Sequence, residues 1–301
     1  MPIPLVTTPI REIARAAGDI VTTNLPVNPL SFLLLTLQVT AGAVSPTLNN
    51  LLAAWTRIEV LFKGTSIISL NATDLHRLVC RLWRQQLPVL QFNAVTPTFV
   101  RLTLPITFTR VPWWMEEGFP ATRSGELQLR VTYAAAFTNF TLPVETLTSV
   151  ELLDANPTRF LKYTTIFDAA VAIGDRAQID LPIGNPVLGI LLRGTTVPGA
   201  AMTSTIRRLK LLVDNVEYAY NQVERDPLTM IGLIGMDYPN AFQPNLTDWD
   251  NHTYLQFDPF QDGSFALRTE GRARVMLEFR ADAADNVRVV PVELIGLKAG
   301  A

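Results

Sequence analysis

The chain has 301 residues, of which 48% are hydrophobic, and its 25 basic and 27 acidic residues give a formal net charge of -2. Its length fits two domains of about 150 residues each. The balanced charge argues against a protein that binds nucleic acid over its whole surface, because such proteins carry an excess of basic residues. The single cysteine excludes an internal disulfide bond.

The most informative feature of the sequence is an internal repeat. Residues 18–27 (GDIVTTNLPV) match residues 174–183 (GDRAQIDLPI) at a constant offset of 156. Four further segment pairs keep the same order: 57–61 with 208–212, 74–75 with 226–227, 99–105 with 254–259, and 125–133 with 271–279. A period of this size predicts two similar domains in tandem, since solenoid repeats have periods of about 20–50 residues.

In the first half, most segments predict short strands separated by turns rich in Pro, Gly and Asn. The apolar spacing of Leu75, Leu78, Val79, Leu82 and Trp83 predicts a helix over 73–86, with Thr73 or Asp74 as its N-cap. We expect a short helix at 9–17 and strands at 20–25, 31–39, 57–62, 65–70, 99–109, 126–134 and 137–142.

In the second half, the same patterns predict more strands and one counterpart of the helix, near 226–236. The expected strands are 159–166, 176–183, 188–195, 206–213, 216–220, 253–258, 264–268, 272–280 and 287–295. The junction at 145–156 is not a flexible Gly/Ser linker, and its apolar residues predict that it packs. We therefore expect domains at 1–148 and 149–301.

Each half offers about seven to nine strands and one inserted helix. This set predicts an all-β fold of two tandem eight-stranded jelly rolls, a double jelly roll, each with a short inserted helix. An immunoglobulin-type sandwich is the alternative, but it needs only about 100 residues.

Residues with metal-binding or nucleophilic chemistry are few and scattered. His76 lies beside the apolar helix face, which favours a structural role, and His252 lies in the polar segment 248–253. That segment predicts a solvated loop, with calcium ligation by its carboxylates as the alternative. Cys80 lies in an apolar run and is expected in the core. We therefore predict no catalytic, cofactor-binding or metal-binding residue.

The sharpest local feature is the segment 111–120, VPWWMEEGFP. Trp113 and Trp114 with Glu116 and Glu117 fit sugar stacking and acid/base hydrolysis, or carbohydrate binding without catalysis. However, adjacent side chains of an extended segment point in opposite directions, so the two carboxylates would not flank one glycosidic bond. The alternative is a loop whose aromatic residues fill a subunit interface, where Trp is enriched.

The repeat, the inserted helices, the packed junction and the missing catalytic set resemble the double-jelly-roll major capsid proteins of tailless, membrane-containing icosahedral dsDNA viruses. The compact length is most similar to the corticovirus-like end of a group that includes the tectivirus type, and the resemblance covers about residues 10–297. It rests on architecture and not on a diagnostic motif, so it assigns no functional residues.

The resemblance implies a structural protein of the virion, made in the host cytoplasm. Three chains would form a pseudo-hexameric homotrimer that contacts neighbouring trimers, with vertex or minor capsid proteins as further partners. An internal membrane would separate shell from genome, so no direct nucleic acid contact is expected. The N-terminal residues would make a weak contact with this membrane or clasp a neighbouring subunit: Ile3, Leu5, Ile10, Arg11, Ile13 and Arg15.

The start of the chain shows no signal-peptide pattern, which requires a charged start and an apolar stretch. The longest apolar-rich run, Leu30 to Val39, falls short of the roughly 20 residues that span a bilayer. Both observations agree with synthesis in the cytoplasm.

Overall fold

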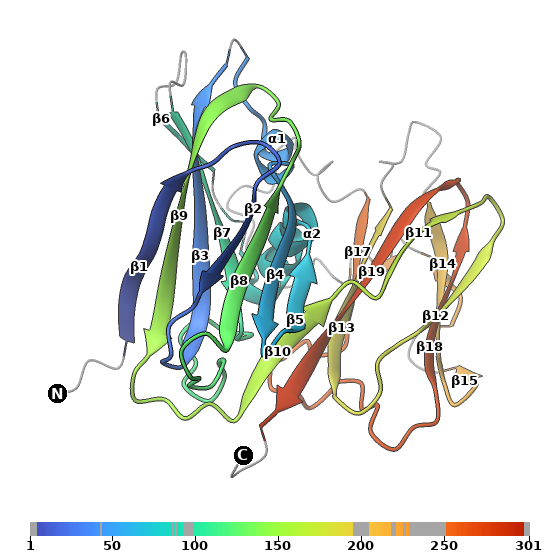
Figure 1. Cartoon of the computed structure of the whole chain (residues 1–301). Coiled ribbons are helices and arrows are strands. Elements are labelled where there is room, and N and C mark those ends of the chain that lie inside the picture. Colours follow the sequence, from blue (N-terminus) through green and yellow to red (C-terminus); the bar gives the residue numbers. More distant parts are fainter. Residues whose placement is uncertain are drawn as a thin grey trace. The chain divides into compact units, whose positions relative to one another are not determined.

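The computed structural model describes residues 5–42, 44–85, 87, 89–92, 99–194, 205–217, 221–224, 227–228, 231 and 251–297. The chain forms two compact units (Figure 1): unit 1 comprises Met1–Lys162 with Gly296–Ala301, and unit 2 comprises Tyr163–Ile295. The predicted boundary between residues 148 and 149 falls inside a strand of unit 1, β9 (Phe140–Leu152).

Unit 1 contains two antiparallel sheets. One has the strand order β1-β9-β3-β7-β6, and the other contains β2-β8-β4-β5. Its helices are α1 (Leu48–Leu52) and α2 (Ala72–Trp83), and α2 lies between β5 and β6 in the chain. The remaining strands are β1 (Leu5–Ala14), β2 (Ile20–Asn24), β3 (Leu30–Ala41), β4 (Trp55–Phe62), β5 (Thr65–Leu70), β6 (Val89–Phe92), β7 (Phe99–Thr107), β8 (Leu127–Tyr133) and β10 (Arg159–Thr164), which leads into unit 2.

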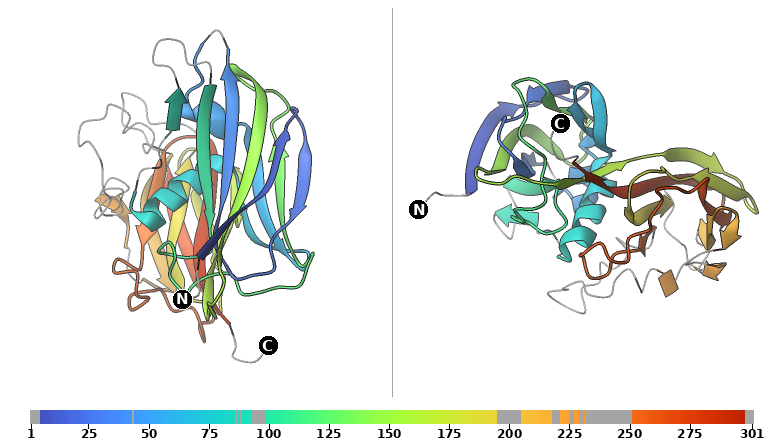
Figure 2. Two further views of the ribbon diagram at one scale, coloured as in Figure 1. Left: turned by 90° about the vertical axis from the view of Figure 1, so that its left-hand side faces the viewer. Right: turned by 90° about the horizontal axis from the view of Figure 1, so that it is seen from below.

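Unit 2 repeats this strand order. One sheet contains β11-β19-β13-β17, and the other has the order β12-β18-β14-β15, with β16 also paired to β14. Figure 2 shows the strands from two further directions. Their bounds are β11 (Phe167–Val171), β12 (Arg176–Asp180), β13 (Val187–Gly194), β14 (Ile206–Val213), β15 (Val216–Glu217), β16 (Val223–Glu224), β17 (His252–Gln256), β18 (Val275–Ala281) and β19 (Asp285–Gly296).

The two orders correspond strand by strand, which defines two jelly rolls. In unit 1 the strands β1, β9, β3 and β7 occupy the places that β11, β19, β13 and β17 occupy in unit 2, and the second sheets correspond likewise. The all-β double-jelly-roll prediction is therefore confirmed. Within the described residues, only unit 1 shows a complete inserted helix, because most of the predicted counterpart at 226–236 lies outside them.

The repeated sequence block forms the same turn in both units. Gly18 and Gly174 have φ angles of 81° and 85°, and the main-chain N–H of each donates at 2.8 Å to the chain at the end of β8 or β18. The carboxylates of Asp19 and Asp175 each accept a hydrogen bond from the N–H three residues earlier, at 2.9 and 2.8 Å. The duplication is therefore preserved in hydrogen bonding as well as in sequence.

A second repeated contact follows this block. The side-chain amide of Asn28 donates to Glu151 at 2.6 Å, and that of Asn185 donates to Glu293 at 2.9 Å. Both glutamates are buried. Each contact therefore ties the turn before β3 or β13 to the end of β9 or β19 and satisfies a carboxylate that would be costly to bury alone.

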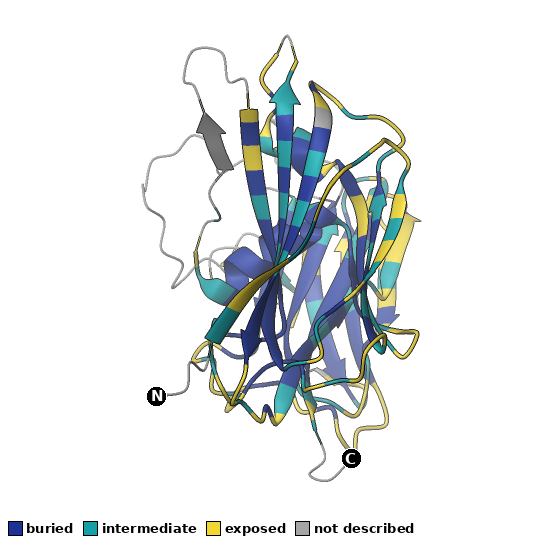
Figure 3. Ribbon diagram, turned by 60° about the vertical axis from the view of Figure 1, so that its left-hand side comes forward, coloured by how far each residue is buried: buried dark blue, intermediate teal, exposed yellow. Residues whose placement is uncertain are grey.

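Each unit has its own apolar core, built from strands with one buried face. Along β8, Leu127, Leu129, Val131 and Tyr133 are buried, while the residues between them are half-buried. This confirms the predicted alternation of a sheet with one wet face, and Figure 3 shows the same alternation along neighbouring strands. The core of unit 2 draws on every strand of its jelly roll except β15.

Several predicted elements are wrong. Residues 9–17 do not form a helix, because Leu5–Ala14 is strand β1 and pairs with β9 along its length. The strand predicted at 137–142 is confirmed from residue 140, where β9 begins, but β9 continues to Leu152 through the segment predicted as a packed junction at 145–156. The long-range pairing of β9 with β1 and β3 is not visible in the local sequence. Within 264–268, only Leu267 forms a bridge, to Val187.

The helix over 73–86 is confirmed as α2, but its N-cap is Asn71. The Asn71 side chain accepts a hydrogen bond from the N–H of Asp74 at 2.8 Å, as N-cap asparagines commonly do.

We expect Gly18→Ala and Gly174→Ala each to lower the free energy of unfolding by about 1 kcal/mol, because an L-residue is strained at positive φ. A Cβ at either site would meet nothing within 4 Å, so backbone strain is the whole effect. Urea unfolding of each variant measures this loss in the free energy of unfolding. Gly296→Ala is the control, since it has equal space without positive φ. Unequal losses at the two turns would contradict their equivalence.

Candidate functional site

The loop at 108–126 joins β7 to β8 in unit 1 and contains the four residues weighed as a sugar site against a structural loop: Trp113, Trp114, Glu116 and Glu117. Gly118 allows the loop to pass close to the start of β3, since a Cβ there would lie 2.9 Å from the Leu30 carbonyl oxygen. The N–H of Gly118 donates to the carbonyl of Arg159 at 3.0 Å. These contacts hold the end of the segment 110–118 against the starts of β3 and β10.

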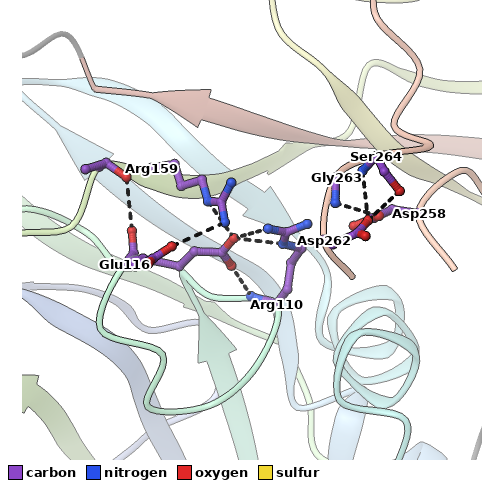
Figure 4. A network of polar contacts seen from close by, with 9 residues as sticks. Arg110, Glu116, Arg159, Asp258, Asp262, Gly263 and Ser264 are labelled. Atoms are coloured by element: carbon purple, nitrogen blue, oxygen red, sulfur yellow. Dashed lines mark hydrogen bonds and ion pairs between the residues drawn. The ribbon is translucent and has the colours of Figure 1, made fainter. Parts of the chain in front are cut away.

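Glu117 lies in a buried polar network with Arg110 and Arg159, and Figure 4 shows these two arginines together with Glu116. Its side chain is fully buried, and it accepts hydrogen bonds from the main-chain N–H of Arg110 at 3.0 Å and from Arg110 Nε at 2.8 Å. Arg159 Nε forms an ion pair with the same carboxylate at 3.0 Å. Two guanidinium groups thus compensate one carboxylate, which is the condition for burying a charge.

Trp114 completes this network. The guanidinium carbons of Arg110 and Arg159 lie 5.2 and 5.4 Å from its ring centroid, in the range of cation–π contacts. The indole is half-buried and is contacted by the two arginines that pair with Glu117. We conclude that Trp114 and Glu117 stabilise the loop.

The side chains of Trp113 and Glu116 are instead exposed to solvent. Trp113 is 56% exposed and has a φ of 63°, and its ring centroid lies 6.0 Å from that of Phe32 in an edge-to-face arrangement. The Glu116 side chain is 69% exposed and lies 3.8 Å from Arg159. The structure therefore does not bring the two carboxylates, or the two indoles, onto one accessible surface. The segment is a series of turns and not the extended chain expected from the sequence.

The histidines and the cysteine are buried. His76 and Cys80 lie one turn apart on α2, with Nδ1 and Sγ at 3.9 Å, so both occupy core positions as predicted. The solvated loop predicted around His252 is wrong at that residue, because His252 is 1% exposed in β17 and pairs in register with Arg193. Residues 248–250 lie outside the described residues. Over the part of the chain that the structure describes, no cluster of potential ligands could hold a metal ion.

Sequence reasoning missed a second buried network in unit 1. Glu145 in β9 is fully buried and accepts hydrogen bonds from Arg11, Arg15 and the Tyr133 hydroxyl. Burial and the neighbouring carboxylate raise the pKa of Tyr133, so its hydroxyl stays protonated and donates. The feature that could have revealed this network is the charged residue Glu145, two positions before apolar Leu147 in the segment predicted as a packed junction.

The arrangement of two jelly rolls in one chain defines the double-jelly-roll fold. No family model and no curated protein sequence matches this chain. The fold is shared with solved viral structures. The major capsid protein P2 of bacteriophage PM2 is 12% identical with a TM-score of 0.64, and the match covers 98% of both chains.

Two further structures have the same fold. The STIV MCP is 13% identical with a TM-score of 0.69, and the match covers 97% of this chain and 96% of that one. A chain of the PBCV-1 virus capsid is 10% identical with a TM-score of 0.64, with 98% and 95% covered. No helix within the described residues is long and apolar enough to cross a membrane.

We expect Glu117→Gln to lower the free energy of unfolding by about 3 kcal/mol, because it removes a buried carboxylate that pairs with both Arg110 and Arg159. Glu116→Gln removes an equal charge from an exposed site, and we expect a change below about 0.5 kcal/mol. Urea unfolding of both variants measures the difference. Similar losses would show that Glu117 is not the structural partner of the two arginines.

We expect Cys80 to be unreactive toward a thiol reagent such as DTNB at pH 7–8 in the native protein. Burial raises the pKa of this thiol, so the reactive thiolate is scarce, and the side chain is also inaccessible. In guanidinium chloride, one equivalent per chain should react. Rapid stoichiometric reaction of the native protein would place Cys80 outside the core.

Proposed function

We propose that this chain is a major capsid protein with a structural and not a catalytic role, located in the virion. The observation that carries the proposal is the nearly complete, reciprocal match of both jelly rolls to chains of viral capsids. A shared fold alone does not fix function. The burial of Glu117 adds support, because it removes the carboxylate pair on which the competing glycan-active enzyme depends.

The proposed assembly is a homotrimer with a pseudo-hexagonal outline. Three copies of two similar units give six similar units around one threefold axis, and such closed symmetry is usual for soluble oligomers. Neighbouring trimers and minor proteins at vertices are the further proposed partners, and the near-neutral net charge gives no reason to add nucleic acid.

The proposed membrane contact of the N-terminal segment must be consistent with strand β1. Residues 5–14 pair with β9, so they are not free to form an amphipathic helix on a lipid surface. Ile13 is 48% exposed on this edge strand. A contact of β1 with a membrane or with a neighbouring subunit would therefore use its exposed side chains while the strand stays in its sheet.

We expect the purified protein to have a native mass of three times 33.3 kDa, about 100 kDa, by light scattering. Negative-stain images of that species should show a hexagonal outline. A protein that stays monomeric at high concentration would contradict the proposed trimer. A sugar screen of wild type against Trp113→Ala would then test a carbohydrate-binding role for the exposed indole.

A further inference from the structure

A row of three arginines crosses one sheet of unit 2. Arg176 in β12 lies directly opposite Arg280 in β18, and Arg280 lies directly opposite Arg208 in β14. Residues directly opposite each other in an antiparallel pair project from the same face, and all three are exposed. Figure 1 shows these strands in unit 2.

This arrangement works against folding. Cβ atoms of directly opposite residues lie only about 4.5–5.5 Å apart, and like charges at such positions destabilise a sheet. Arg208 is paired with Glu224 of β16 at 2.8 Å. Arg176 and Arg280 have no hydrogen-bond or ion-pair partner among the described residues.

The equivalent row in unit 1 shows that the fold does not require the arginines. There Ile20 of β2 lies opposite Thr132 of β8, which lies opposite Arg57 of β4. Arg57 is paired with Glu59 at 3.0 Å. The same backbone positions thus carry one compensated arginine in unit 1 and three arginines in unit 2.

The row borders a small cavity of about 70 Å³ on the sheet. Arg176, Arg208, Lys210 and Arg280 contribute four positive charges to its lining, and Glu278 contributes the single negative charge. Glu278 accepts a hydrogen bond from Gln178 at 2.8 Å. The cavity therefore has a net positive charge even after Glu224 is counted against Arg208.

We propose that this cavity binds a tetrahedral oxyanion, a phosphate or sulfate group. Adjacent strands are about 4.8 Å apart, so neighbouring guanidinium groups can reach different oxygens of one such group. A carboxylate of a second protein copy has only two oxygens, and a single guanidinium fork satisfies both. This site does not depend on the proposed capsid role.

The test replaces the row with the residues that unit 1 carries at the same places, Arg176→Ile with Arg280→Thr. Binding of inorganic phosphate is measured by calorimetry and by the shift in melting temperature, against chloride at equal ionic strength. We expect wild type to bind phosphate and the double variant to bind at least about tenfold more weakly, since charge-assisted hydrogen bonds are lost. Without phosphate, the double variant should melt no lower than wild type, because a repulsion is removed.

The matched control is Arg123→Thr with Arg268→Thr, which removes two exposed arginines outside the row. It should bind phosphate as wild type does.

A second experiment identifies the source of the oxyanion: vesicles of phosphatidylcholine with phosphatidylglycerol are compared with phosphatidylcholine alone. If wild type binds the anionic vesicles and the double variant does not, the oxyanion is a lipid headgroup. If this difference appears with inorganic phosphate and not with the vesicles, the oxyanion is a free anion.

Two results would overturn the proposal. One is equal phosphate binding by wild type and the double variant, or no binding by either. The other is a fall in native mass of the double variant without any phosphate effect on wild type, which would assign the row to acidic side chains of a second copy. A wild-type chain that is monomeric yet binds phosphate through the row would contradict the trimer and leave the oxyanion site intact.

Discussion

The structure of unit 1 depends on compensating the carboxylates buried along β9. An unpaired buried charge costs several kcal/mol, so each carboxylate fixes the position of its partners. Glu145 holds the arginines of the first strand and of the following turn together with the Tyr133 hydroxyl, and Glu151 holds Asn28 in the turn before β3. Elements far apart in the sequence, β1, β8 and the start of β3, are thereby tied to one central strand.

The compensation of buried charges by residues far away in the sequence explains which parts of the fold could be predicted. Strands with strict alternation, such as Leu127–Tyr133, could be predicted, because burying one face of a sheet imposes a period of two. Strands β1 and β9 could not, because their charged residues are compensated by partners more than 100 residues away. A local pattern contains no sign of that compensation, so it predicts a helix over most of β1 and a packed junction over the second half of β9.

The internal repeat extends beyond the block at 18–27 and 174–183, and the extension also corresponds to equivalent contacts. After the matched block, the sequence continues NPL in one half and GNPV in the other, with one inserted residue, Gly184. Allowing for that insertion aligns Asn28 with Asn185, which make equivalent contacts with buried glutamates. The split of the 111–120 loop into inward and outward residues was also predictable, whereas the cation–π contacts of Trp114 were not, since Arg159 lies 45 positions along the chain.

Comparison of the two units separates what the fold requires from what it permits. The glycine turns and the asparagine contacts occur in both units, so they are features that the two jelly rolls of this chain share. The Glu117 network and the arginine row each occur, among the described residues, at one of two equivalent places. Because the two units have separate sequences within one chain, equivalent backbone positions can carry different residues without loss of the fold. The arginine row differs from the Glu117 network in one respect: both arginines of the network contact a carboxylate, whereas Arg176 and Arg280 contact none among the described residues. This difference is why the row, and not the network, is the proposed anion site.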